Sequence, residues 1–153
     1  MMRTPWKILE KWRAPGRAAA HPAGSDGAPP EATATTTVRG KAAEDAALHY
    51  LQQQGLQLLA RNFRTPGRGG GEIDLVMQER DGTVVFVEVR QRGRADFGGA
   101  ASSIGAAKQR RIVLAARHYL AAQPRLPACR FDAVLVEPAV TWLRAAFDAG
   151  EGI

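Results

Sequence analysis

A helical period of apolar residues is the first clear pattern along the chain, and it covers residues 40–54. Its apolar positions recur at spacings of three and four, which places them on one face of a helix: Ala43, Ala47, Leu48 and Leu51. Gly55 follows directly and is typical of a helix C-terminus. The apolar run 56–63 then predicts a short strand, and the segment 64–71, rich in proline, glycine and arginine, predicts a loop.

Two strands are predicted next, over residues 72–78 and 83–90, because β-branched and other apolar residues dominate both runs. The Asp81-Gly82 pair between them is a strong signal for a tight hairpin, which makes the two strands antiparallel neighbours. A long helix is predicted over residues 105–123, where apolar residues again recur at helical spacing before Pro124 ends the element.

A last strand is predicted over residues 130–137. The apolar positions that follow it have helical spacing and predict a short closing helix: Trp142, Leu143, Ala146 and Phe147. The strand 83–90, the long helix and the last strand form a βαβ crossover, whose two strands lie parallel in one sheet. The element order therefore predicts an α/β fold, an αβββαβ core with a mixed central sheet flanked by helices.

Residues 1–39 differ in composition from the rest of the chain. They combine repeated prolines, the stretch Gly24-Ser25-Asp26-Gly27 and a Thr/Ala run with almost no apolar period. This composition is typical of a disordered, low-complexity basic arm, although an organelle transit peptide is an alternative. The globular domain is then residues 40–153, which is long enough for one hydrophobic core.

The chain carries a formal net charge of +6 at pH 7. Such a charge favours a polyanionic partner, of which nucleic acid is the usual one, while a solvated basic surface is the alternative. The single cysteine, Cys129, excludes an internal disulfide and fits a reducing cytoplasm. No apolar run approaches the roughly 20 residues that cross a bilayer, so we expect a cytoplasmic protein with no membrane partner.

Glu88 is a carboxylate inside the run Val-Val-Phe-Val-Glu-Val, which is typical of a strand buried on both faces. A lone charge there is costly unless it is paired or binds a metal. Because strand side chains alternate, the hairpin places Asp74 on the same face and nearly opposite Glu88. Two converging carboxylates suit Mg²⁺ or Mn²⁺, whereas an ion pair of Glu88 with Arg90 or another basic residue is the alternative.

Arg90 lies two residues beyond Glu88, on the same face of the predicted strand. A cation there can neutralise charge that develops on a phosphate. A guanidinium stays protonated and cannot act as a general base, so water activation would fall to a metal ion.

The segments Gly71-Glu72-Ile73-Asp74-Leu75 and Val87-Glu88-Val89-Arg90 resemble the PD-(D/E)XK nuclease signature. More closely, residues 40–147 resemble the YraN family of uncharacterised bacterial proteins. Further matching segments are Gly40-x-x-x-Glu44, Arg61-Asn62-Phe63-Arg64, Val85-Phe86, Phe97-Gly98, Lys108-x-x-Arg111-Ile112 and Arg130-Phe131-Asp132. This resemblance implies a restriction-endonuclease-like fold, related in layout to archaeal Holliday-junction resolvases.

The resemblance also implies roles for the acidic strand residues. Asp74 and Glu88 would be metal ligands, with the Val89 carbonyl as a third ligand to Mg²⁺ (or Mn²⁺). Glu44 would be an additional catalytic acid that orients a water molecule, and a solvent-facing or capping Glu44 is the alternative. Arg90 occupies the lysine position of the signature, which puts base catalysis from this position in doubt.

Basic residues flank the predicted acidic pair on both sides in sequence. Lys108 opens the second helix, and the exposed N–H groups of a helix N-terminus favour phosphate. We expect a set of five side chains to grip a nucleic-acid backbone, with a solvated basic turn as the alternative: Arg64, Arg68, Arg92, Lys108 and Arg111. Asp132, at the start of the last strand, is interpreted as structural.

The resulting hypothesis is a Mg²⁺-dependent endonuclease that hydrolyses phosphodiester bonds of DNA, branched or damaged DNA included. The alternative is a non-catalytic nucleic-acid-binding or assembly protein that keeps the nuclease fold. A third hypothesis is an interaction module whose arm, residues 1–39, binds another protein. Whether the protein forms a homodimer stays open at this stage.

Overall fold

The computed structural model describes residues 31–91, 104–137 and 139–150. The chain divides into two units, Met1–Pro30 and Glu31–Ile153, and every described residue belongs to the second unit. The predictions made for residues 1–30 and for Arg92 therefore lie outside the described part of the chain.

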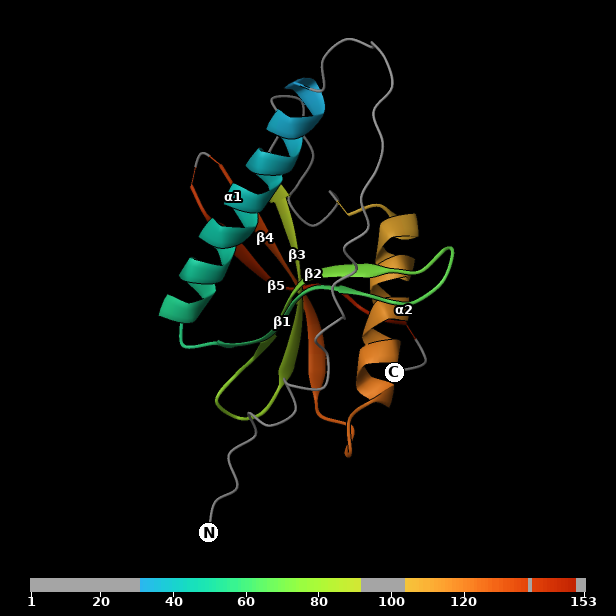
Figure 1. Cartoon of the computed structure of the whole chain (residues 1–153). Helices are drawn as coiled ribbons and strands as arrows, with labels where there is room; N and C mark the ends of the chain where they lie inside the picture. The colour runs from blue at the N-terminus through green and yellow to red at the C-terminus, as the bar shows by residue number, and fades with distance from the viewer. Residues whose placement is uncertain (1–30, 92–103, 138, 151–153) are drawn as a thin grey trace, which may run out of the picture. The chain divides into compact units, whose positions relative to one another are not determined.

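Two helices and a five-stranded sheet make up the described unit (Figure 1). In chain order they are α1 (Glu31–Gln53), β1 (Gln57–Arg64), β2 (Glu72–Gln78), β3 (Val84–Gln91), α2 (Ala106–Ala121), β4 (Cys129–Val136) and β5 (Thr141–Phe147). The spatial order of the strands follows the sequence, β1-β2-β3-β4-β5. Only β3 and β4 pair in parallel, so the predicted mixed sheet with an αβββαβ core is confirmed.

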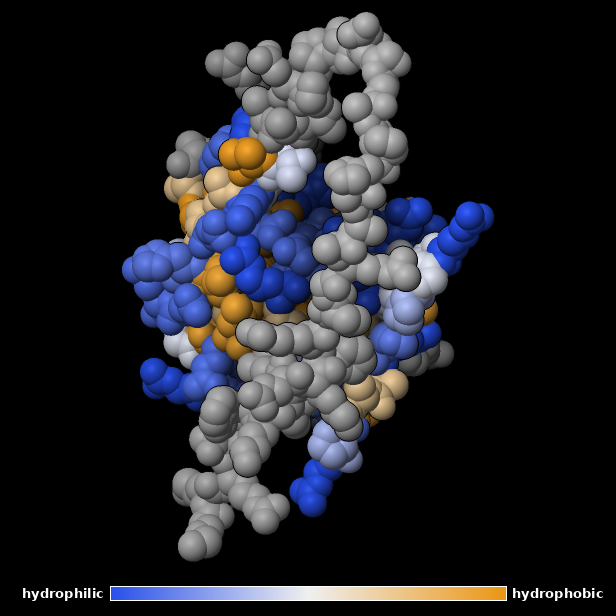
Figure 2. Space-filling view, in the orientation of Figure 1, coloured by the Kyte–Doolittle hydropathy of each residue, from blue (hydrophilic) through white to orange (hydrophobic). Residues whose placement is uncertain are grey.

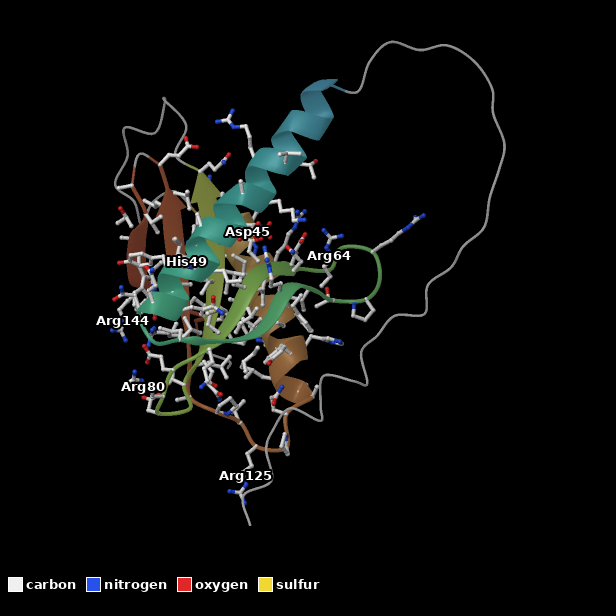
Figure 3. The ribbon with its side chains drawn as sticks, turned by 60° about the vertical axis from the view of Figure 1, so that its left-hand side comes forward. Asp45, His49, Arg64, Arg80, Arg125 and Arg144 are labelled. Atoms are coloured by element: carbon white, nitrogen blue, oxygen red, sulfur yellow. The ribbon has the colours of Figure 1, made fainter. Side chains whose placement is uncertain are left out.

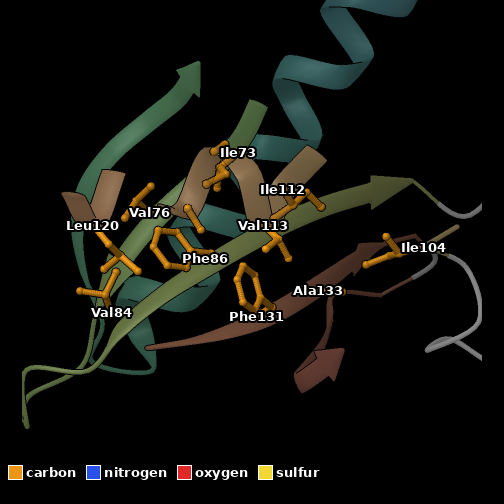
Figure 4. Close-up of a cluster of buried hydrophobic side chains, with 12 residues drawn as sticks. Ile73, Val76, Val84, Phe86, Ile104, Ile112, Val113, Leu120, Phe131 and Ala133 are labelled. Carbon is orange, nitrogen blue, oxygen red and sulfur yellow. The ribbon is translucent and has the colours of Figure 1, made fainter. Parts of the chain in front are cut away.

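The two helices cover opposite faces of the sheet. Ala47 and Leu51 of α1 are fully buried in one cluster, together with Val87 of β3. Ile112 of α2 belongs to the other cluster, which includes Phe86 of the same strand (Figure 4). Adjacent residues of β3 thus point to different helices, which is the alternation that a strand buried on both faces requires.

Helix α1 begins at Glu31, not at Gly40, so residues 31–39, which the sequence placed in the arm, are helical. The apolar period identified only the part of the helix that packs on the sheet, from Ala43 to Leu51. Once that part is nucleated, each further residue adds a backbone hydrogen bond and needs no apolar partner. Val38, for example, is 67% exposed within the helix.

The predicted closing helix is wrong, because Thr141–Phe147 forms strand β5 antiparallel to β4. Trp142 packs in the cluster on the α1 side and Leu143 in the cluster on the α2 side. A bulge opposite Asp132 then separates the register pairs Ala133–Leu143 and Phe131–Phe147. The bulge produces apolar spacings of three and four residues, and these imitate a helical period.

Asp132 is fully buried in β4 and completes this bulge. Its carboxylate accepts hydrogen bonds from the Trp142 indole N–H at 2.8 Å and the Ala145 backbone N–H at 2.9 Å. Arg130 Nε donates a third at 2.9 Å, and the same guanidinium makes two 2.8 Å hydrogen bonds to Glu79. These donors satisfy the buried charge, as a structural Asp132 requires.

Candidate metal centre

The β2–β3 hairpin brings Asp74 and Glu88 to the same level of the sheet. Hydrogen bonds from Gly82 N to Glu79 O and from Glu79 N to Thr83 O close the turn, at 3.0 and 2.9 Å. The strand register then runs to its last pair, Leu75 with Val87. Asp74 and Glu88 are the next residues in the two strands, as the hairpin signal predicts.

The strands part immediately beyond that last pair, and the Asp74 carboxylate lies at the separation. Its Oδ2 accepts a 2.7 Å hydrogen bond from the backbone N–H of Val89. The regular alternation of β2 also breaks here, because Ile73 packs in the α2-side cluster and Leu75 in the α1-side cluster. Strict strand alternation would place Ile73 and Leu75 on one face, and that expectation is wrong here because the β2–β3 ladder ends at this level.

Glu88 is 7% exposed, and its Oε2 atom has no hydrogen-bond partner among the described residues. Burial and, after it, the neighbouring Asp74 carboxylate together raise the pKa of Glu88 from 4.5 to about 7. The pKa of Asp74 is also raised, chiefly by burial, while the hydrogen bond from Val89 opposes the shift. The two acids therefore repel each other in a poorly solvated place.

Lys108 supplies a cation to this pair. Its Nζ lies 3.2 Å from Glu88 Oε2, and its charge lowers the pKa values of both acids. The ammonium is within ion-pair distance but lacks the alignment of a hydrogen bond, so the attraction is mainly Coulombic. Of the ion-pair partners that the sequence left open for Glu88, the structure selects Lys108 and not Arg90.

The donor set fits a divalent cation. A buried carboxylate oxygen without a hydrogen bond, beside a second carboxylate, is the oxygen-rich environment that Mg²⁺ and Mn²⁺ prefer. The described residues contain no cluster of three His, Cys, Asp or Glu side chains suited to a metal ion. Asp74 and Glu88 would therefore hold it as a pair, a number that Mg²⁺ commonly uses together with water and substrate phosphate. The Val89 carbonyl as third ligand stays a prediction.

Glu44 lies on α1 and faces β1. Its Oε2 accepts hydrogen bonds from Arg61 at 3.4 Å and from Asn62 at 3.2 Å. Its charge contributes to the raised pKa of Asp74, as the smallest of the causes. Glu44 is thus half-buried, hydrogen-bonded to β1 and close enough for its charge to affect Asp74. Its role in orienting water stays a prediction.

Arg90 follows Glu88 by two residues near the end of β3 and is half-buried. Within residues 31–91, 104–137 and 139–150, its side chain makes no hydrogen bond or ion pair. Its guanidinium therefore has no interaction partner among the described residues. This is compatible with the proposed contact to a phosphate, which stays a prediction.

The β1–β2 loop, which carries basic residues, packs directly on α2. A side chain at Gly71 would overlap the backbone carbonyl of Arg111, so loop and helix touch through their backbones. Arg64, at the start of this loop, is 71% exposed and pairs with Glu72 at 2.9 Å (Figure 3). Arg68 and Arg111 are also exposed, and hydrophilic side chains cover the projecting loop (Figure 2). Arg92 lies outside the described residues.

Sequence reasoning missed two contacts of this centre: the Val89 N–H that holds Asp74 and the lysine that neutralises Glu88. The first contact depends on where the two strands part, and no local sequence pattern predicts that position. The second contact joins residues on different elements, and the only signal was Lys108 itself, interpreted as a nucleic-acid contact.

No helix of the described chain is long and apolar enough to cross a membrane.

Comparison of the sequence with known proteins assigns the chain to a family. Residues 43–136 match the profile of the uncharacterised protein family UPF0102, and the chain belongs to that family. The match confirms the resemblance to the YraN-type family, and it contains both strands of the candidate centre.

Relatives from several bacteria are similar to most of the chain. A UPF0102 protein of Paracidovorax citrulli is 68% identical over 117 residues, which cover 76% of this chain and 87% of that protein. A UPF0102 protein of an Acidovorax species is 64% identical over 116 residues, covering 75% and 88%. One of Verminephrobacter eiseniae is 65% identical over 118 residues, covering 75% and 81%.

Proposed function

We propose that this chain is a divalent-metal-dependent endonuclease that hydrolyses phosphodiester bonds of DNA, with branched or damaged DNA as the substrate class. The observation that carries the proposal is the buried Glu88 Oε2, which has no hydrogen-bond partner among the described residues and lies beside a second carboxylate. Two buried acids held together lower the stability of a fold. A site that retains them therefore fits a ligand better than a purely structural role.

Each group of the centre has a chemical task in this proposal. Asp74 and Glu88 hold the cation, and the Val89 N–H keeps the Asp74 carboxylate oriented toward the site. When bound, the cation would polarise the phosphate and lower the pKa of a water molecule. Arg90, which stays protonated, offers positive charge to the phosphate and accepts no proton.

The surroundings favour a polyanionic substrate. The first turn of α2 holds no acidic residue, and Lys108 stands within it. Arg64 and Arg68 flank or belong to the β1–β2 loop, which packs on α2 where Gly71 meets the Arg111 carbonyl. With a net charge of +6 over the whole chain, these cations support attraction of a nucleic-acid backbone.

Calorimetric titration of Mn²⁺ tests the metal centre directly. We expect binding to the wild type and a loss of at least about tenfold in affinity for Glu88→Gln. Glu137→Gln, which removes an exposed carboxylate just after β4, is the matched control and should bind like the wild type. The same proteins are then assayed for Mg²⁺- or Mn²⁺-dependent nicking of linear, flapped and four-way DNA.

A non-catalytic nucleic-acid-binding protein is the second candidate. The ion pair of Lys108 with Glu88 favours it, because a lysine can stabilise the buried carboxylate without any metal. In that case the wild type binds DNA in a salt-sensitive way but binds no Mn²⁺, and DNA affinity survives Asp74→Asn. Absence of Mn²⁺ binding by the folded wild type would therefore refute the endonuclease and leave the binding protein.

A further inference from the structure

The contact between Lys108 and Glu88 joins a partly exposed cation to a buried anion. The Lys108 side chain is 39% exposed, whereas that of Glu88 is 8% exposed. The Nζ–Oε2 distance of 3.2 Å is not accompanied by hydrogen-bond alignment. The ammonium therefore neutralises the carboxylate while remaining accessible from solvent and loosely held.

Lys108 is also free to turn toward a ligand in front of the centre. Its four-carbon stem carries an ammonium with rotatable donors, so a change of partner needs only side-chain rotation. No acidic residue in the first turn of α2 competes for it. Gly105, the N-cap, supplies no side-chain cap, so the N–H groups of this helix end favour an anion as well.

We propose that Lys108 is an exchangeable counter-ion, which holds Glu88 in the metal-free protein, gives way to the divalent cation and then contacts the nucleic-acid phosphate. This inference rests on the proposed endonuclease function. It adds a helix residue, Lys108, to the phosphate contact that the proposed function gives to Arg90.

The charge balance explains why the exchange sets an order of binding. The lysine neutralises at most one of the two carboxylates, so the metal-free centre offers no net positive charge to a phosphate. A divalent cation neutralises both carboxylates and leaves the ammonium uncompensated. The centre is then net positive and attracts phosphate, so metal binding precedes productive DNA binding.

The test compares Lys108→Gln with Arg110→Gln, which removes an exposed cation from the same part of α2. Mn²⁺ and Lys108 compete for Glu88, so Lys108→Gln should bind Mn²⁺ about three- to tenfold more tightly than wild type. Arg110→Gln should change this affinity by less than about twofold, because an exposed charge is screened. Lys108→Arg, which keeps the cation, should bind Mn²⁺ like the wild type.

DNA affinity provides the second readout, measured by fluorescence anisotropy with an uncleavable four-way DNA with and without Mn²⁺. Mn²⁺ should tighten DNA binding to the wild type, and this gain should disappear in Lys108→Gln despite its higher metal affinity. If the ion pair were purely structural, Lys108→Gln would not raise the affinity for Mn²⁺ and at the same time abolish the Mn²⁺-dependent gain in DNA affinity.

The outcomes separate the two levels of the proposal. A wild type that binds no Mn²⁺ overturns both the endonuclease and the exchange. If the wild type binds Mn²⁺ but Lys108→Gln binds it no more tightly, the metal centre stands and the exchange is refuted. An equal gain in Mn²⁺ affinity in Arg110→Gln also refutes the exchange, because the effect would then come from a general change in the electrostatic potential around the centre.

Discussion

Asp74 accepts a 2.7 Å hydrogen bond from the backbone N–H of Val89, the residue that follows Glu88 in the neighbouring strand. This hydrogen bond takes the place of a backbone–backbone hydrogen bond at the point where β2 and β3 part, just beyond the pair Leu75–Val87. It aligns one carboxylate of the candidate metal centre beside the other. The same few atoms therefore terminate the strand pairing and build the site.

Replacing Asp74 should separate the structural from the chemical role of its carboxylate. Asp74→Ala and Asp74→Asn both remove the charge that repels Glu88, but only Asp74→Ala leaves the part-buried Val89 N–H without an acceptor. The free energy of unfolding of Asp74→Ala should therefore be about 1–3 kcal/mol lower than that of Asp74→Asn, and both variants should lose Mn²⁺ binding. Urea unfolding with EDTA and calorimetry check this, and equal stability of the two variants would argue against the Val89 contact.

The stability of the metal-free protein should fall as pH rises from 4.5 to about 7. The pKa of Glu88 is raised from 4.5 to about 7, so the folded state binds more protons than the unfolded chain in this window. Its contribution to the free energy of unfolding should drop by about 3 kcal/mol across the window and stay constant above it. Glu88→Gln removes this titration, so the difference between the two unfolding curves isolates it. A difference independent of pH would contradict the raised pKa.

Metal affinity should depend on pH in the opposite direction. A carboxylate must lose its proton to bind a cation, and the pKa of Glu88 is about 7. Mn²⁺ affinity should therefore rise by up to about tenfold per pH unit below 7 and level off above it. Calorimetry in buffers of different ionisation enthalpy should detect proton release at pH 6 and little at pH 8. Equal proton release at both values would show that another group titrates.

Gly71→Ala should disrupt the contact between the β1–β2 loop and α2. An added methyl group would overlap the Arg111 carbonyl, and backbone cannot yield as a side-chain tip can. We expect a loss of about 1–3 kcal/mol in the free energy of unfolding, together with weaker DNA binding because Arg64 and Arg68 move. Gly40→Ala in α1 has open space around it and should instead stabilise by up to about 1 kcal/mol. A neutral Gly71→Ala would contradict the close backbone contact.

Arg68→Ala should weaken DNA binding in a salt-dependent way. If this exposed loop arginine neutralises one phosphate, its removal lowers the slope of log affinity against log salt by about 1. Arg125→Ala is the control, since Arg125 is exposed just beyond the far end of α2 (Figure 3). Fluorescence anisotropy at several salt concentrations measures both slopes. A similar change in both would indicate unspecific attraction by net charge.

Parts of the fold could be predicted because their determinants are local. Asp81 and Gly82 define a turn within a few residues, and the Asp81 carboxylate does accept a 2.9 Å hydrogen bond from the Thr83 N–H. The continuous apolar run in β3 identified a strand buried on both faces, and strand alternation together with the turn placed Glu88 near Asp74. By contrast, β5 could not be predicted, because its bulge depends on Asp132 of another strand.

The sequence by itself determined the αβββαβ order of the core, the mixed sheet and the burial of an acidic residue in β3, since periodicity and turn chemistry act over neighbouring residues. Only the tertiary structure decided which groups neutralise that acid. Lys108 reaches Glu88 because α2 crosses back over the sheet, and Val89 reaches Asp74 because two strands part at that level. Such contacts depend on packing between elements distant in sequence, and no local pattern encodes their geometry.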